Sequence, residues 1–163
     1  MNYLSMTKAE IANGRGVRVA LWVSGCNHYC KNCQNPESWN CNAGKKFTDE
    51  DFNNLIKELS LPYYDGLTLT GGDPLHPSNI KDVENIVIKL KELLPNKTIW
   101  CYTGYDYEQV KHLNIMNYID VLVDGLYIDE LRDITLPFKG SSNQRVINMP
   151  ETIKQKKIVL LEE

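Results

Sequence analysis

Two hydrophobic patterns alternate along the chain, one with a period of two residues and one with the spacing of a helix. Val17, Val19, Leu21 and Val23 fall on alternate positions, which predicts a strand over residues 16–24 with one apolar face. Short apolar runs predict further strands at residues 66–70, 98–102 and 120–124. The apolar run at residues 158–161 predicts either a last strand or an apolar tail.

Apolar residues at helical spacing predict two longer helices between these strands. The first begins after Thr48, a capping residue with the acidic Asp51 three positions later, and ends before Pro62. Its apolar positions are Phe52, Leu55, Ile56 and Leu59. The second begins after Ser78 as its cap and ends at Pro95, and its apolar stripe consists of Val83, Ile86, Val87, Leu90 and Leu94. A short helix is expected after Gly104.

Strands that alternate with helices predict βαβ units, and therefore an α/β domain with a mostly parallel sheet. Because four or five units are too few for a closed eight-stranded barrel, we expect a partial (βα) barrel or an open twisted sheet. Ligand sites in such folds lie in the loops beyond the carboxyl ends of the strands. Residues 25–33, 71–74, 103–104 and 124–125 all fall there, so we expect these four loops to form one site.

The composition narrows the possible functions. The 163 residues suit one domain, and a net charge of −3 with interspersed signs argues against a nucleic-acid or anionic membrane partner. We interpret the basic stretch 154–157 as a solvated face. No apolar run is long enough to span a bilayer, and the N-terminus lacks a basic region followed by an apolar core, so we expect a cytoplasmic protein.

Three of the five cysteines lie in one short loop, in the spacing Cys26-x3-Cys30-x2-Cys33. Thiolates this close can converge on a soft metal centre, and three ligands instead of four leave a metal position open to another ligand. Cys41 and Cys101 are then free thiols. The alternative is a non-catalytic zinc-binding module with His28 or Cys41 as the fourth ligand, although the spacing lacks the second ligand pair typical of such sites.

The cysteine spacing after the first strand, followed by Gly71-Gly72-Asp73-Pro74 after the second, resembles the radical S-adenosylmethionine enzymes. Within that superfamily, the chain is similar to the activating proteins of anaerobic (class III) ribonucleotide reductase. This resemblance covers about residues 2–148 of a single 1–163 domain, with 149–163 as a tail. The segments that carry it are 13–18, 23–26, 71–77, 102–105, 123–125 and 140–145.

The resemblance implies a function that matches the open metal position. Cys26, Cys30 and Cys33 would bind three irons of one [4Fe-4S] cluster, and the fourth iron would bind S-adenosylmethionine. The resulting 5′-deoxyadenosyl radical would abstract hydrogen from a glycine of the large glycyl radical subunit of the reductase. The resemblance also implies a reduced flavodoxin- or ferredoxin-like electron donor. The alternative target is another glycyl radical enzyme, such as pyruvate formate-lyase, or a small heterocycle.

The resemblance further implies a cofactor-binding set around the cluster. Asn32, Cys33 and Gln34 would lie against the adenine through main-chain polar groups. Gly71 and Gly72 would let the backbone approach the methionine end, with Asp73 fixing the turn, although a tight turn needs glycine in any case. Thr103 and Asp124 would bind the ribose or the amino group, or form ordinary turns.

Several other polar and aromatic residues near these motifs have simpler interpretations. We interpret His28 as an exposed loop histidine that hydrogen-bonds a neighbour and His76 as structural. Residues 143–145 would either anchor the partner or shape the floor of the pocket. Trp22, Trp39 and Trp100 are expected to be packing residues.

Overall fold

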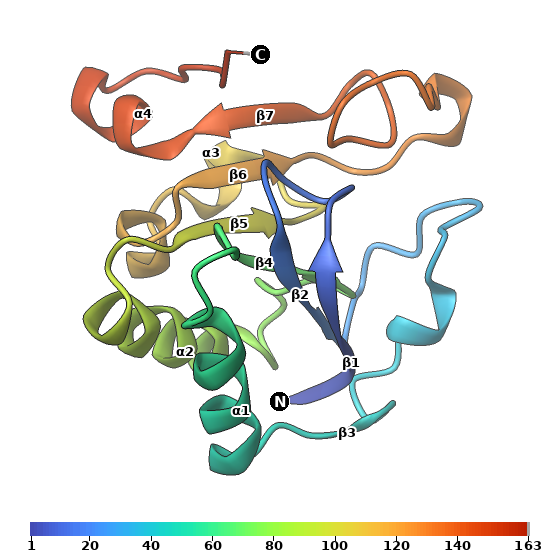
Figure 1. Ribbon diagram of the computed structural model, residues 1–163. Helices are drawn as coiled ribbons and strands as arrows, with labels where there is room; N and C mark the ends of the chain where they lie inside the picture. The colour runs from blue at the N-terminus through green and yellow to red at the C-terminus, as the bar shows by residue number, and fades with distance from the viewer. Residues whose placement is uncertain (163) are drawn as a thin grey trace.

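A computed structural model describes residues 1–162 and shows one seven-stranded sheet with helices packed on one face (Figure 1). The strands are β1 (Asn2–Glu10), β2 (Arg18–Val23), β3 (Lys45–Lys46), β4 (Gly66–Gly71), β5 (Thr98–Tyr102), β6 (Val121–Asp124) and β7 (Arg145–Asn148). The α-helices are α1 (Asp49–Leu59), α2 (Ile80–Leu93), α3 (Tyr107–Val110) and α4 (Met149–Gln155). Three short 3₁₀ helices are η1 (Pro36–Ser38), η2 (Asn114–Asn117) and η3 (Asp129–Leu131).

The sheet has the strand order β3-β1-β2-β4-β5-β6-β7. The four strands that the sequence predicted, β2, β4, β5 and β6, are parallel neighbours at its centre. β1, β3 and β7 pair antiparallel at the two sides. The α/β class is therefore confirmed, but the expected mostly parallel sheet is corrected to a mixed one.

The sequence pattern missed β1 because this strand does not keep a period of two. Its pairing with β2 shifts register between Tyr3 and Ser5 and again between Thr7 and Glu10. Each irregularity inserts a residue that breaks the alternation of faces. Ala9 also has a positive φ of 51°, which is unusual in a strand.

The two long helices form where they were predicted, with one difference at a cap. Thr48 caps α1 in a reciprocal capping box with Asp51, as expected. The cap expected at Ser78 is wrong, because the residue before α2 is Asn79. The Asn79 side chain is buried and donates hydrogen bonds to the carbonyl oxygens of Ser24 and Asp73 instead of capping the helix.

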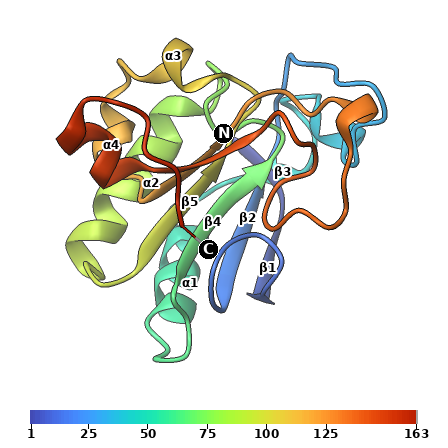
Figure 2. The same ribbon diagram turned by 90° about the horizontal axis from the view of Figure 1, so that it is seen from above.

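Both faces of the central sheet are buried, but in different ways. On one face Leu21, Leu69 and Ile99 pack with apolar residues of α1 and α2 in the main core. On the other face Trp100, Val121 and Val123 pack against Phe138 and Leu161 of loops and against Tyr102 and Val146 of the sheet. The view from above shows α2 and α3 on one side of the strands and long loops on the other side (Figure 2). Loops fill a face less completely than helices, and this face holds the candidate site.

The segment after residue 148, expected as a tail, begins with α4. Met149 and Thr152 of this helix are buried. Leu160 then forms an isolated antiparallel bridge with Ile147, so the run 158–161 returns to the sheet without becoming a full strand. Glu163, the last residue of the expected tail, lies outside the described residues.

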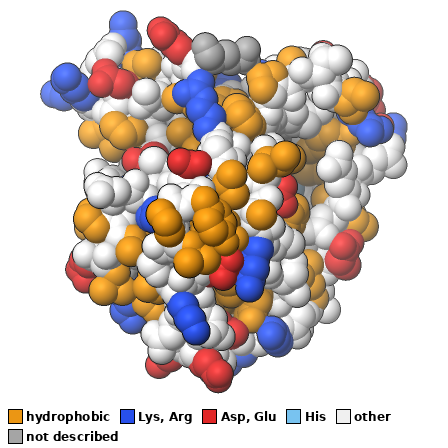
Figure 3. All heavy atoms as spheres, in the orientation of Figure 1, with side chains coloured by type: hydrophobic (Ala, Val, Ile, Leu, Met, Phe, Trp, Pro, Cys, Tyr) orange, Lys and Arg blue, Asp and Glu red, His pale blue; other side chains and the backbone are white. Residues whose placement is uncertain are grey.

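Two further observations concern the surface and the helices. On the face shown in Figure 3, acidic and basic side chains are interspersed and hydrophobic side chains gather over the centre. None of the helices within residues 1–162 combines the length and the apolar character that a membrane span requires.

Arg18 supports the loop-covered face of the sheet from inside. Arg18 is 1% exposed, and its guanidinium donates hydrogen bonds to the hydroxyl oxygens of Thr68 and Thr98 and to the carbonyl oxygens of Arg15, Leu67 and Thr98. Burial lowers the pKa of Arg18 to about 10, so the group stays charged at neutral pH. The bonds join β2, β4 and β5 below the site.

Replacing Arg18 tests this support. Arg18→Met keeps most of the apolar length but leaves buried oxygens without a donor, so we expect the free energy of unfolding to fall by about 3 kcal/mol in urea denaturation. Lys8→Met is the control, because the Lys8 side chain is 71% exposed, and it should change the value by less than about 0.5 kcal/mol. Equal effects of the two substitutions would contradict this role.

Candidate functional site

The three clustered cysteines lie in a loop that leaves the carboxyl end of β2. The loop is joined to the next segment of the chain by backbone hydrogen bonds from Gly25 to Ser38 and from Cys26 to Trp39, at 2.6 and 3.2 Å. Cys33 donates a backbone hydrogen bond to Cys30 at 3.1 Å. All three cysteines are partly buried and unpaired, whereas Cys41 is exposed and Cys101 is buried in the core.

Cys30 and Cys33 open onto a cavity of about 430 Å³ on the loop-covered face of the sheet. The sheet contributes Trp22, Thr70, Gly71 and Tyr102, and the long loop after β6 contributes Tyr127, Phe138 and residues between them. Gln34, which the resemblance placed beside the cofactor, also borders this cavity. The cysteine loop therefore meets a hollow large enough for a small ligand.

The chemistry of the cysteines fits an iron-sulfur cluster. Within residues 1–162, no three His, Cys, Asp or Glu side chains come together closely enough to hold one metal ion. A four-iron cluster does not need such convergence, because each cysteine binds a different iron. Burial raises the pKa of Cys26 to about 11 and also raises the pKa of Cys30, so these thiols are protonated until a metal displaces the protons.

Gly71 and Gly72 bring the turn after β4 into close contact with the end of β2. A Cβ atom on Gly71 would lie 2.6 Å from the backbone nitrogen and oxygen of Val23, and one on Gly72 would lie 2.6 Å from the oxygen of Gly25. Gly71 also has a φ of 105°. Both glycines are thus needed for packing against the protein's own backbone, and Gly71 in addition borders the cavity.

Asp73 connects the turn with the other loops of the site. Its side chain is 1% exposed and accepts hydrogen bonds from the Thr103 hydroxyl and from the backbone of Gly104, each at 2.9 Å. His28, from the cysteine loop, places its Nε2 atom 2.6 Å from the same carboxylate. The hydrogen bond expected for His28 is therefore present, although its ring is largely buried and not exposed.

Asp124 is also used within the protein. Its carboxylate pairs with the Arg145 guanidinium and accepts the backbone hydrogen of Tyr107. Arg145 in turn contacts Glu108, and these two acids raise the pKa of Arg145. Gly125 donates a backbone hydrogen bond to Tyr105, which completes the fourth loop. The four loops expected at this end of the sheet therefore meet, because Asp73 bonds the cysteine loop and the loop after β5, and Asp124 and Gly125 also bond the segment after β5.

Of the remaining residues singled out from the sequence, Asn32 and His76 bond elsewhere in the protein, whereas Asn143 and Gln144 belong to a segment beside the cavity. Asn32 has a positive φ of 56°, and its side chain donates to Asp129 of η3 rather than pointing into the cavity as a partner for a ligand. His76 hydrogen-bonds Ser78 locally, as expected for a structural role. The side chains of Asn143 and Gln144 donate to the carbonyl oxygens of Leu126 and Gly125, so this segment shapes the pocket, and Gln144 lines it.

Tyr102 is a site residue that the sequence analysis missed. Tyr102 lines the cavity, and its buried hydroxyl has no hydrogen-bond partner among residues 1–162. The indole nitrogen of Trp39, which does not line this cavity, is also buried without a partner in these residues. Burial raises the pKa of Tyr102 well above its usual range, so the hydroxyl remains a donor. Side chains alternate along β5, so Tyr102 lies on the same face as Trp100, opposite the core residues Ile99 and Cys101. This alternation could have placed Tyr102 on the cavity side from the sequence.

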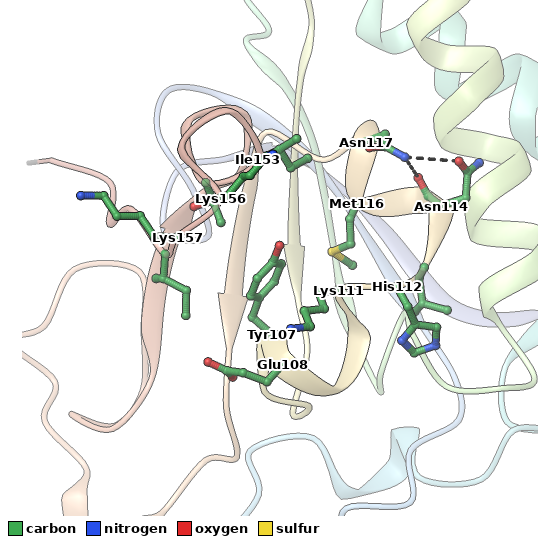
Figure 4. A pocket seen from close by; sticks show the side chains of 13 residues that line it. Tyr107, Glu108, Lys111, His112, Asn114, Met116, Asn117, Ile153, Lys156 and Lys157 are labelled. Carbon is green, nitrogen blue, oxygen red and sulfur yellow. Dashed lines mark hydrogen bonds between the residues drawn. The ribbon is translucent and has the colours of Figure 1, made fainter.

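A larger cavity of about 660 Å³ is formed by other residues, between α3, η2 and α4 (Figure 4). Tyr107, Met116 and Ile153 contribute its apolar surface, with Lys111 and Lys156 among its polar residues. Lys154 to Lys157 are exposed, as expected for a solvated face. This cavity contains none of the residues that the resemblance singles out.

Comparison with known proteins agrees with the cysteine site. Residues 12–147 match the family model described as "4Fe-4S single cluster domain". The class defined by the fold and the site is thus an α/β protein with one iron-sulfur cluster.

Individual relatives share most of their length with this chain. The anaerobic ribonucleoside-triphosphate reductase-activating protein of Enterobacteria phage T4 is 43% identical over 146 residues, which is 90% of this chain and 93% of the relative. The proteins of the same name from Haemophilus influenzae and Escherichia coli K12 are 42% and 39% identical, over 88% and 90% of this chain and 96% and 97% of their own. The chain belongs to the family of anaerobic ribonucleoside-triphosphate reductase-activating proteins.

Two glycines with similar φ values test the contact between β4 and β2. Gly71 and Gly125 have φ values of 105° and 97°, but a Cβ on Gly125 would be 3.6 Å from its nearest neighbour. Alanine at either position introduces backbone strain of about 1 kcal/mol, and only Gly71→Ala adds a backbone clash worth about 2 kcal/mol more. We expect this difference in the urea denaturation of the cluster-free protein, and similar losses for both variants would contradict the assigned contact.

Proposed function

We propose that this protein activates anaerobic ribonucleotide reductase by using a [4Fe-4S] cluster and S-adenosylmethionine to form a glycyl radical on the large reductase subunit. The observation that carries the proposal is the opening of the cysteine loop onto the cavity beside the sheet, in a chain of the activating-protein family. When bound, the cluster and S-adenosylmethionine supply a 5′-deoxyadenosyl radical that removes a hydrogen atom from the target glycine.

The three clustered cysteines would hold the cluster in this proposal. Cys26, Cys30 and Cys33 each supply one thiolate, and the donor set is one short of the four that close an iron-sulfur site. Cys30 and Cys33 border the cavity, so the open position is expected on that side. A reduced flavodoxin- or ferredoxin-like protein is the proposed electron donor.

S-adenosylmethionine would bind in the 430 Å³ cavity, on what we propose is the inner face of a partial barrel. Cys33, Gln34 and Gly71 border the cavity directly, and the proposed backbone contact of Asn32 would come from the residue next to Cys33. The unpartnered hydroxyl of Tyr102 offers a hydrogen bond to a polar group of the cofactor. This site would use polar groups that the protein itself leaves free.

The other predicted cofactor-binding residues would act by holding the loops. The side chains of Asp73, Thr103 and Asp124 are buried and already bonded within the protein, and Gly72 packs on Gly25. Direct contact with the ribose would require these bonds to break. We therefore propose that they keep the walls of the cofactor site in place.

The reductase would cover the mouth of the cavity during the reaction. Ile134, which lines the cavity, is 85% exposed, and Ile11, next to the lining residue Ala12, is 72% exposed. Exposed apolar side chains beside an open site suit a protein surface that excludes water when it docks. The names of the relatives favour the reductase over pyruvate formate-lyase as the target.

Single cysteine substitutions test the proposal. Cys26→Ala, Cys30→Ala and Cys33→Ala should each reduce iron and sulfide content and abolish the glycyl radical signal of the reductase subunit, because each removes one cluster ligand. The measurement is electron paramagnetic resonance after anaerobic reconstitution with dithionite and S-adenosylmethionine.

Cys41→Ala is the matched control, since this exposed cysteine lies outside the cluster loop, and Cys101→Ala is the buried one. Both should retain iron, sulfide and the radical signal. Stoichiometric zinc without sulfide in the wild-type protein would replace the proposal with the zinc-module alternative, and a normal signal from a triple alanine variant at positions 26, 30 and 33 would refute it.

A further inference from the structure

The buried carboxylate of Asp73 receives donors from three separate segments. Leu75 donates from the turn itself at 2.9 Å, and Thr103 and Gly104 donate from the loop after β5. His28 is the contribution of the cysteine loop, with its Nε2 atom 2.6 Å from Oδ2 of Asp73. Through this contact, the loop between Cys26 and Cys30 is attached to the end of the sheet.

The surroundings of His28 form a slot for its ring. A Cβ atom on Gly104 would lie 2.5 Å from Cδ2 of His28, so the ring occupies the space that any side chain at Gly104 would take. Tyr105 packs edge-on against the ring, with 4.7 Å between the ring centroids. The φ of Gly104 is outside the left-handed region, so it is the histidine ring, and not the backbone, that requires glycine here.

Other side-chain contacts of the cysteine loop are more exposed. Lys31 pairs with Glu130 at 3.3 Å, but their side chains are 73% and 66% exposed, and such pairs contribute little. Asn32 bonds Asp129 in an exposed position. The contact between His28 and Asp73 is short and largely buried, which makes it the stronger attachment.

We propose that His28 is a positioning residue and not an iron ligand: its contact with Asp73, in the slot beside Gly104, fixes the segment from Cys26 to Cys30 before a cluster binds. Preorganised ligands lose less conformational freedom when they bind. The loop should therefore load and retain a cluster better than a free loop of the same sequence. The part that concerns the cluster rests on the proposed function, whereas the ordering of the loop does not.

A double-mutant cycle between His28 and Gly104 tests the proposal in the cluster-free protein. His28→Ala removes the ring, and Gly104→Ala displaces it without removing any atom of the histidine. We expect each variant to accelerate hydrogen-deuterium exchange of the peptide covering residues 26–33 by about tenfold, which corresponds to about 1.4 kcal/mol. In the double variant, Gly104→Ala should add nothing further, because the ring with which it collides is absent.

Two further variants serve as controls. His28→Gln keeps a side-chain nitrogen able to donate to Asp73 and should restore much of the protection. His76→Ala removes a histidine whose ring bonds Ser78 and no residue of the cysteine loop. Exchange at residues 26–33 should therefore stay at the wild-type rate. The urea midpoint of each variant shows whether a change is local or global.

A second readout separates positioning from general stability. After reconstitution, His28→Ala should lose iron to a chelator several times faster than the wild type, and His28→Gln should lose it at an intermediate rate. If His28 acted only as an iron ligand, its replacement would leave exchange in the cluster-free protein unchanged, and glutamine would not slow the iron loss.

Unchanged exchange or unchanged iron loss in His28→Ala would overturn the proposal. An effect of Gly104→Ala that is equally large in the wild type and in His28→Ala would also overturn it. These results are distinguishable from failure of the proposed function. A wild-type protein that forms no glycyl radical on the reductase would refute the function, while the exchange measurements in the cluster-free protein would still decide the role of His28.

Discussion

The buried carboxylate of Asp73 is the interaction on which the arrangement of the site depends. A carboxylate that is removed from water must be satisfied by several donors, and here the donors come from the cysteine loop, the glycine turn and the loop after β5. Because these donors belong to different segments, satisfying one charge brings the segments together. The ion pair between Asp124 and Arg145 does the same for the last strand.

The two faces of the sheet explain where the cavity lies. On the helical face, α1 and α2 supply enough apolar side chains to close the core. On the other face, loops cover only part of the surface, and the buried Arg18 guanidinium bonds Thr68 and Thr98 of neighbouring strands. A hollow bordered by cysteines and by the unpartnered Tyr102 hydroxyl remains there. In the proposed function, this hollow holds S-adenosylmethionine.

The proposed chemistry depends on two incomplete surfaces. Three thiols leave one position of a four-iron cluster open, which suits an external ligand. The cavity beside them has exposed apolar residues near its mouth, which suits a partner protein. A reactive carbon radical must be kept from water, so a site that is closed only by its target would link radical formation to docking.

The sequence by itself determined the four central strands, both long helices and the cysteine loop, because local periodicity, capping residues and ligand spacing are all written in neighbouring positions. It did not show β1, whose register shifts break the alternation, or the antiparallel β7. Only the tertiary structure decided the partners of Asp73, Asp124 and His28 and the buried, unpartnered position of the Tyr102 hydroxyl, since each depends on residues far away in the chain. The contact of His28 with Asp73 spans 45 residues, and no local pattern encodes such a distance.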